Sequence, residues 1–414
     1  MLEALPPGPE LAMAYSNCSQ LDMLAHETDS AVSWARRTIE LAEPLGRPDI
    51  LSHALNNLGT ARLIRGDLGG WEDVERSLEL ALTGNFQEHA ARAYTNMSWQ
   101  AAGMYQLDRA SGYLEDGIAY CDEHDLDSWR LYMLGLSSRV QFERCDWTRA
   151  SEEAETVLRD PRTAPISRLT ALTTVGHMRV RLGDPDPASP LQEARMLAAN
   201  IGEIQRIAPV VCALAEAAWL RGDRETVVRE IREVYERART QRDPWVRGTL
   251  AVWLHRAGAL EETPTELANP FGLEISGRWA EAARAWESLN VPYEQALILA
   301  WHGGEAEQRE ALAIFERLGA DPASQSLRKR MREQGIQSIP RGSRSSTRQD
   351  PHGLTRREAE ILGLLCEGLR NAAIAKRLFL STKTVDHHVS AILTKLGVPS
   401  RAEAVAMARK LAHR

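Results

Sequence analysis

Six aspartates recur at nearly constant intervals in the first 223 residues, and this repeat constrains the fold more than any other feature of the chain. Intervals of 38 to 41 residues separate Asp29, Asp67, Asp108, Asp146, Asp184 and Asp223. Each aspartate is interpreted as part of a short turn, such as Arg65-Gly-Asp or Arg221-Gly-Asp. Helices of small and apolar residues precede the turns, as over 54–64 and 208–220, and further helices follow them, as over 71–82 and 225–238. A helical hairpin repeated at this period predicts an all-α solenoid, in which stacked hairpins bury one continuous core.

Small and aromatic residues inside these helices are interpreted as packing residues. Close approach between neighbouring helices is expected at Gly59, Gly103, Gly135, Gly176 and Ala215. The tryptophans Trp99, Trp219 and Trp286 lie in helical stripes and are assigned to the core rather than to a ligand box. The concave surface of a solenoid can bind a peptide or a small effector, but no residue of the sequence identifies such a pocket.

The last sixty residues are predicted to form four short helices with their own start and stop signals. Thr355 and Glu358 form a capping box at the first helix, and Gly368 ends it. Asn371 is expected to cap the second helix, and Ser381 the third, which spans 382–396 and ends at Gly397. Ser400 to Glu403 is a second capping box, which opens the fourth helix. The apolar residues expected to face the core are Ile361, Leu362, Leu364, Leu365, Ile374, Ala375, Leu378, Val385, Val389, Ile392, Leu396, Val405, Ala408 and Leu411.

The second and third helices are close enough to form a helix-turn-helix, whose exposed helix can enter a DNA major groove. If the valines of 382–396 face inward, short polar and basic side chains face outward. These are Lys383, Asp386, His387, Ser390 and Thr394, with Thr384, Ala391 and Lys395 at the edges. Lysines suit phosphates, whereas His387 and Ser390 can reach base edges. Asp386 has two interpretations: it accepts from a cytosine amino group, or, in the reading we favour, it holds Lys383 in place.

The segment from about Leu354 to Ala408 closely resembles the LuxR-type helix-turn-helix of bacterial transcription regulators. The shared pattern runs from Leu354-Thr-x-Arg-Glu through Gly368-x-x-Asn-x-x-Ile-Ala and Thr384-Val-x-x-His-Val to Lys395-Leu-Gly-Val. The resemblance implies that the third helix reads double-stranded promoter DNA and that the fourth, over 402–411, mediates a homodimer. The candidate DNA-contacting residues are Asn371, Ser381, Thr382, Lys383, Thr384, Asp386, His387, His388, Ser390, Ala391, Thr394, Lys395 and Arg401.

Charge supports this interpretation independently, because a basic tail follows an acidic body. Residues 354–414 carry a net charge of +6 and residues 328–353 carry +5. Since the whole chain has a net charge of −7, residues 1–327 carry −18. Such an asymmetry suits a tail that binds a polyanion. Proline, glycine, serine and arginine without apolar periodicity predict a flexible basic linker over 335–353. The expected domains are therefore a helical-repeat domain over 1–334, this linker, and a DNA-binding domain over 354–414.

The repeats resemble degenerate tetratricopeptide units. Together with the last helical portion, 271–334, and the terminal domain, they resemble the C-terminal half of the large ATP-binding LuxR-family regulators. Those proteins have a nucleotide-binding module before the repeats, whereas no G-x-x-x-x-G-K-[ST] loop occurs in this sequence. The interpretations left open are a shortened member, a fragment and a gene with a misplaced start.

Other classes of protein are disfavoured by composition. The sequence has neither a signal peptide nor a run of eighteen apolar residues, which argues for a cytoplasmic protein without a membrane partner. The scattered cysteines Cys18, Cys121, Cys145, Cys212 and Cys366 form no CxxC pair, which indicates reduced thiols and no zinc site. His387 and His388 adjoin on a helix and face different directions, so a shared metal is not expected. No constellation for catalysis stands out, and neither an enzyme nor a cofactor is expected.

Two classes of function are carried forward. The first is a sequence-specific, DNA-binding transcription regulator whose repeats sense a protein or a small-molecule effector. The alternative is a helical-repeat interaction scaffold whose terminal domain binds DNA weakly or is vestigial. The capped third helix and the basic tail favour the regulator.

Overall fold

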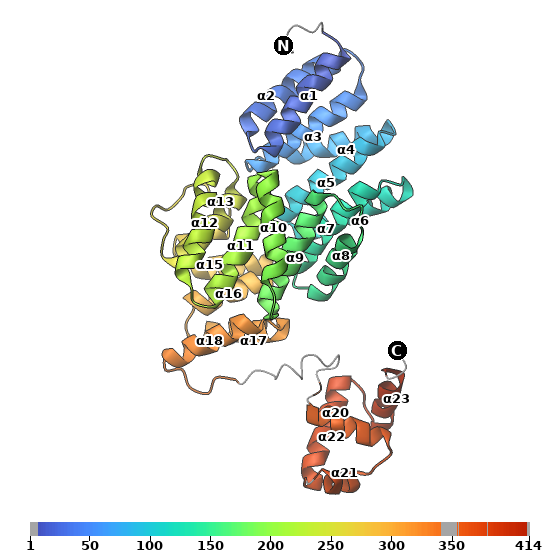
Figure 1. Cartoon of the computed structure of the whole chain (residues 1–414), viewed down its shortest axis with the longest axis vertical. Coiled ribbons are helices and arrows are strands. Elements are labelled where there is room, and N and C mark those ends of the chain that lie inside the picture. The colour runs from blue at the N-terminus through green and yellow to red at the C-terminus, as the bar shows by residue number, and fades with distance from the viewer. Residues whose placement is uncertain (1–6, 341–353, 355, 379, 412–414) are drawn as a thin grey trace. The chain divides into compact units, whose positions relative to one another are not determined.

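All regular elements are helices in the part of the chain that the computed structural model describes, which comprises residues 7–340, 354, 356–378 and 380–411 (Figure 1). The chain divides into two compact units, Met1–Gln337 and Ser338–Arg414. Most of the linker expected over 335–353 lies outside the described residues. None of the described helices combines the length and the apolar character that crossing a membrane requires.

The first unit contains a long series of helical hairpins followed by shorter helices. The hairpin series comprises α1 (Pro9–Leu24), α2 (Thr28–Ala42), α3 (Pro48–Ile64), α4 (Gly70–Thr83), α5 (Gln87–Gly103), α6 (Leu107–Glu123), α7 (Asp127–Glu143), α8 (Trp147–Arg159), α9 (Pro165–Leu182), α10 (Ala188–Ile201), α11 (Ile204–Leu220), α12 (Arg224–Arg239) and α13 (Pro244–Ala257). The shorter helices are α14 (Phe271–Ile275), α15 (Trp279–Ser288), α16 (Pro292–His302), α17 (Glu305–Leu318) and α18 (Asp321–Glu333).

The odd-numbered helices α1 to α13 begin 38 to 40 residues apart, which agrees with the period of the aspartate pattern. Each of these helices packs on the next odd-numbered helix as well as on its neighbours in the chain. They therefore form one continuous layer, and the even-numbered helices lie against it. This is the arrangement of a helical solenoid, as the sequence predicts.

The repeating aspartates do not all lie in turns. Asp146 and Asp223 cap α8 and α12 by accepting hydrogen bonds from the backbone N–H of the residue three positions later. Asp29 and Asp108 lie instead in the first turns of α2 and α6, so their assignment to a turn was wrong. Their carboxylates suit this place because the orphan N–H groups of a helix N-terminus favour negative charge. Each also pairs with an arginine of the next repeat, Arg65 at 3.5 Å and Arg144 at 2.5 Å respectively.

Small residues allow close helix packing at some of the expected positions. A Cβ added to Gly59 would lie 2.5 Å from the carbonyl oxygen of Gly70, and one added to Gly176 would lie 2.6 Å from the Leu191 side chain. Ala215 is fully buried. At Gly103 the prediction was wrong, because no atom lies within 4 Å of an added Cβ. Gly103 ends α5 and faces open space rather than a neighbouring helix.

The series of hairpins curves until its beginning meets its later repeats. Gln205 Nε2 of α11 donates to the Leu24 carbonyl at 3.0 Å, and Gln241 Nε2 donates to the Ala25 carbonyl at 3.2 Å. Arg242 also pairs with Asp29 at 3.3 Å. At the other end of the unit, α18 packs on α9 and α11. The turn between α1 and α2 thus contacts residues about 180 to 216 positions later, and the layer of odd-numbered helices surrounds an interior.

Candidate nucleic-acid interface

Four short helices form the second unit around their own core. They are α20 (Arg356–Cys366), α21 (Asn371–Arg377), α22 (Thr382–Leu396) and α23 (Arg401–Leu411). The buried residues of this core are Leu354, Ile361, Leu362, Leu364, Leu365, Ile374, Ala375, Val385, Ile392, Leu396 and Ala404. Val389, Leu378, Val405 and Ala408 pack against it, as predicted, and Ala404 is a core residue that the sequence pattern did not single out. Leu411 and the Thr355 half of the first capping box lie outside the side chains that the structure describes.

Local backbone signals fix both ends of α22. The Ser381 hydroxyl accepts from the Thr384 N–H at 3.0 Å, which satisfies one of the donors that a helix N-terminus leaves without a partner. Gly397 ends the helix in a left-handed conformation, with φ of +64°. Its fifteen residues make a rod about 22 Å long, which is the size of element that a major groove admits.

One face of α22 is exposed and polar. Lys383, Asp386, His387, Ser390 and Thr394 are exposed, whereas Thr384 and Ala391 at its edges are half-buried. Ser381 and Thr382 at its N-terminus are also exposed, and His388 is half-buried beside the core. Val385 and Ile392 on the opposite face are completely buried, so the rotation of the helix about its axis is set by the core.

Asn371 links three helices rather than capping one. The N-cap of α21 is Arg370, which makes no side-chain capping bond, so the predicted cap at Asn371 was wrong. The Asn371 amide instead donates to Asp386 Oδ1 at 2.7 Å, and its oxygen accepts from Arg401 at 3.0 Å. Arg401 also donates to the Leu369 carbonyl. The partner of Asp386 is therefore Asn371 and not Lys383, because the side chain of Asn371 reaches across to α22.

Lys395 and Glu358 form an ion pair between α22 and α20. The Lys395 Nζ lies 2.6 Å from Glu358 Oε2, and the two side chains are 33% and 7% exposed respectively. A buried carboxylate needs a partner, which gives this lysine a structural role inside the domain. Sequence reasoning missed the pair, because Glu358 had been assigned to a cap and Lys395 to the DNA backbone.

The start of α23 follows the second capping box in part. The Ser400 hydroxyl accepts from the Glu403 N–H at 3.3 Å and donates to the Glu403 carboxylate at 2.8 Å. Ala402, Glu403 and Ala406 are exposed along this helix. Within the described residues, no group of three or more histidine, cysteine or acidic side chains is placed to hold a metal ion.

A short second helix, a turn and a capped third helix with an exposed polar face define a helix-turn-helix domain of the DNA-binding class. Residues 352–408 match the family described as bacterial regulatory proteins, luxR family. The C-terminal unit of this chain is therefore a LuxR-family DNA-binding domain.

Several curated proteins are similar to this domain. A DNA-binding transcriptional activator of Mycobacterium tuberculosis, DevR/DosR, is 48% identical over 68 residues, which are 16% of this chain and 31% of that protein. The transcriptional regulatory protein DegU of Brevibacillus brevis is 48% identical over 58 residues, 14% of this chain and 25% of DegU. The oxygen regulatory protein NreC of Staphylococcus aureus is 49% identical over 57 residues, 14% of this chain and 26% of NreC. The chain thus spans about a quarter to a third of the length of these relatives.

Among solved structures, a chain described as a circular tandem repeat protein with novel repeat topology and enhanced subunit contact surfaces matches 97% of this chain and 98% of its own. Its sequence identity is 14% and its TM-score is 0.23.

Proposed function

We propose that the protein is a sequence-specific transcription regulator that places α22 in the major groove of promoter DNA. The observation that carries the proposal is the exposed polar face of α22, held at a fixed rotation by a buried core, in a domain of the LuxR family. His387 and Ser390 lie on this face and offer donors and acceptors to base edges. Lys383 offers charge to a phosphate, and among the described residues it forms no ion pair.

Asp386 has a positioning role in this proposal. The Asp386 carboxylate accepts a hydrogen bond from the Asn371 amide, which Arg401 holds in turn, so it has a structural partner inside the domain. The chain Arg401–Asn371–Asp386 ties α22 to α21 and to the start of α23. Asp386 and Asn371 then orient the reading helix, and Asp386 keeps one oxygen free for a cytosine amino group.

The test is binding of the full chain to double-stranded DNA. Fragments selected from random duplexes are titrated at several salt concentrations with the wild type, Lys383→Ala, His387→Ala and, as a matched control, Arg284→Ala, an exposed cation on α15 outside the basic tail. Loss of a phosphate contact weakens binding to all sequences, whereas loss of a base contact relaxes the preference at one position. We expect the first effect for Lys383→Ala, the second for His387→Ala, and neither for Arg284→Ala.

The outcome also separates this function from the alternative of an interaction scaffold. If the full chain selects no DNA sequence and has no affinity for duplex DNA even at low salt, the regulator proposal is wrong. Equal binding by the wild type and by Lys383→Ala and His387→Ala would remove α22 as the reading helix.

The dimer is proposed on the same basis. Regulators that read two half-sites match the twofold symmetry of their operator, and α23 presents exposed Ala402 and Ala406 on one side. Sedimentation of the full chain, free and on selected DNA, tests this arrangement. A monomer in both states would contradict it.

The repeats are proposed as the sensing part of the regulator. Their support is a solenoid of curved helical layers that encloses an interior, as described above. A change of DNA affinity on adding an effector would support this role, and an unchanged affinity with a bound effector would contradict it.

A further inference from the structure

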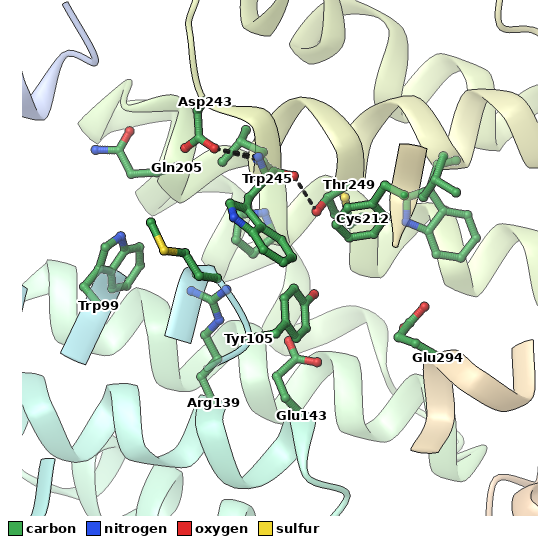
Figure 2. A pocket seen from close by; sticks show the side chains of 18 of the residues that line it. Trp99, Tyr105, Arg139, Glu143, Gln205, Cys212, Asp243, Trp245, Thr249 and Glu294 are labelled. Carbon is green, nitrogen blue, oxygen red and sulfur yellow. Dashed lines mark hydrogen bonds between the residues drawn. The ribbon is translucent and has the colours of Figure 1, made fainter. Parts of the chain in front are cut away.

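The interior of the first unit contains two adjoining cavities. The larger has a volume of about 130 Å³ and the smaller one of about 50 Å³. The walls come from the odd-numbered helices α3, α5, α7, α9, α11 and α13, with α14 and α16 at one end (Figure 2). The residues common to both cavities are Trp99, Arg139, Glu143, His177, Gln205 and Pro209. Trp99 is therefore a wall residue and only half-buried, whereas Trp219 and Trp286 are packed in the core as predicted.

At one end of the larger cavity, the charges compensate one another. Arg181 lies 3.1 Å from the buried Glu216 and 2.8 Å from the partly buried Glu294. Arg256 pairs with Glu274 at 2.8 Å. Burial by itself would raise the pKa of Glu274, but the Arg256 guanidinium lowers it to about 2. This end is a structural network that joins α9, α11, α13, α14 and α16.

At the Trp99 end of the cavities, the guanidinium group of Arg206 has hydrogen-bond donors that are not used. Arg206 is 8% exposed and its guanidinium lies 3.9 Å from the centre of the Trp99 ring. Its Nη2 donates to the Tyr132 hydroxyl at 2.5 Å, whereas its buried Nε and Nη1 have no hydrogen-bond partner among the residues that the structure describes. Glu203 approaches Nε at 3.5 Å without making a hydrogen bond. Buried donors without partners are costly, so these N–H groups call for an acceptor that the described part of the chain does not supply.

Arg139 adds a second cation at this end. Its guanidinium lies 5.3 Å from the centre of the Trp99 ring and has no ion pair within the described residues. Figure 2 shows it directed into the cavity from α7, with Trp99 on one side and Trp245 on the other. Glu143, one turn further along α7, is a wall carboxylate and forms no ion pair with Arg139 within the described residues. Together with the Glu203 carboxylate it balances the charge of the two arginines, but it leaves their guanidinium donors available to an anion.

The rest of the larger cavity is mainly apolar and aromatic, with Asp243 and Thr249 as polar wall residues. Tyr105, Trp245, Trp253 and Phe271 line it, together with Met104. A cavity of about 130 Å³ has room for a molecule with a single ring, since engineered apolar cavities of about 150 Å³ bind benzene. A flat apolar body would fit this lining, and an anionic group would satisfy the guanidinium donors.

We propose that these adjoining cavities bind a small aromatic carboxylate, with its carboxylate at Arg206 and Arg139 and its ring in the larger cavity. The proposal deepens the sensing role given to the repeats above, since it names the chemical class of the effector and its site. The guanidinium N–H groups select a planar anion with two acceptor oxygens over a neutral or cationic ligand of the same shape. A volume of about 130 Å³ is too small for a peptide or a nucleic acid.

The test compares acids with their uncharged isosteres on the full chain. Benzoate and phenylacetate, and in parallel benzamide and phenylacetamide, are titrated by calorimetry and by tryptophan fluorescence. We expect each acid to bind roughly tenfold or more tightly than its amide, because the amide lacks the charge that meets the guanidinium groups. Arg139→Met and Arg206→Met are each expected to reduce the affinity for the acids by about the same factor. Arg284→Met, an exposed arginine on α15, is the matched control and should leave binding unchanged.

Several outcomes would overturn the proposal. Neither acid binding better than its amide would mean that ordered water satisfies the Arg206 donors. If Arg139→Met binds the acids as tightly as the wild type, the anion binds elsewhere. Arg139 is half-buried and forms no ion pair within the described residues, so Arg139→Met decides the question if Arg206→Met fails to fold. The DNA titration of the ligand-free chain is a separate measurement. Sequence-selective DNA binding without acid binding would contradict the proposed ligand site and leave the proposed regulator supported. Acid binding without DNA binding would contradict the proposed regulator and leave the ligand site supported.

Discussion

At the scale of single residues, the two lysines of α22 have different surroundings although they look alike in the sequence. Lys383 is exposed and forms no ion pair in the described part of the chain, whereas Lys395 pairs with the buried Glu358. A phosphate contact contributes to the salt dependence of DNA binding, because it releases counterions. A lysine that satisfies a buried carboxylate contributes to the stability of its domain instead.

Lys383→Ala is therefore expected to lower the slope of log K for DNA binding against log salt concentration by about one. Lys395→Ala should leave this slope unchanged and should lower the free energy of unfolding of the C-terminal unit by ~1–3 kcal/mol. The measurements are DNA titrations across a series of salt concentrations and hydrogen exchange of the α20 and α22 amides. An equal loss of slope in the two variants would make Lys395 a phosphate contact.

A buried histidine makes the stability of the repeats depend on pH. Burial, and after it the charges of Arg92 and His89, lower the pKa of His53 from 6.5 to about 3. The neutral ring is satisfied by Ser16 at 3.0 Å and Gln20 at 3.1 Å. Below pH 6.5 this residue binds a proton in the unfolded chain but stays neutral in the folded chain. The stability that His53 contributes is thus complete above pH 6.5 and is lost as the pH falls from 6.5 toward 3.

As the pH falls through this window, we expect protonation of His53 in the unfolded chain to lower the free energy of unfolding by up to about 1.4 kcal/mol per pH unit. Urea unfolding of the full chain, followed by tryptophan fluorescence at a series of pH values, measures the slope. All tryptophans precede residue 302, so the signal reports the first unit. In His53→Gln the slope of the free energy of unfolding against pH should be smaller by the contribution of one proton. In His387→Gln, on α22, the slope should equal that of the wild type. A wild-type slope in His53→Gln would show that His53 is protonated in the folded chain.

At the scale of elements, the packing of one hairpin depends on a pair of glycines. The Gly59 and Gly70 backbones touch where α3 meets the start of α4, and an added Cβ on either would lie within 2.5 Å of the other's carbonyl oxygen. Gly59→Ala should lower the free energy of unfolding of the first unit by ~1–3 kcal/mol, because the helices must separate. Gly103→Ala, which meets open space, should leave it unchanged or raise it by up to ~1 kcal/mol. Equal urea midpoints for the two variants would contradict this account.

These two glycines also show how far the sequence predicts the elements. The period of the repeat and the caps at Ser381 and Gly397 are local signals, and they predicted helices at nearly the observed positions. Close approach is a property of two helices, so nothing local distinguishes Gly59 from Gly103. Asn371 was assigned to a cap for the same reason. A local rule ranks it as a good cap, but its amide reaches Asp386 and Arg401 from other helices.

At the scale of the whole molecule, the cavity was beyond sequence reasoning. Trp99 of α5 precedes Arg206 of α11 and Trp245 of α13 by more than a hundred residues, and the curvature of the hairpin series brings the three side chains together around the two adjoining cavities. That curvature is fixed where the turn between α1 and α2 meets α11 and the residues before α13. His26 of this turn lines the larger cavity, so closure of the series and the shape of the cavity are linked.

The closure contact can be tested directly. Gln241→Ala removes the hydrogen bond to the Ala25 carbonyl without changing a residue that lines the cavity. Loss of one such bond should raise the rate of amide hydrogen exchange in residues 22–29 roughly fivefold, since the turn is released from α12 and α13 more often. Gln192→Ala, on the exposed side of α10, is the control and should leave exchange there unchanged. If the two variants exchange alike in residues 22–29, the Gln241 bond does not hold the series closed. Benzoate should slow exchange in the same segment of the wild type, because a ligand that binds only the closed arrangement stabilises it by mass action.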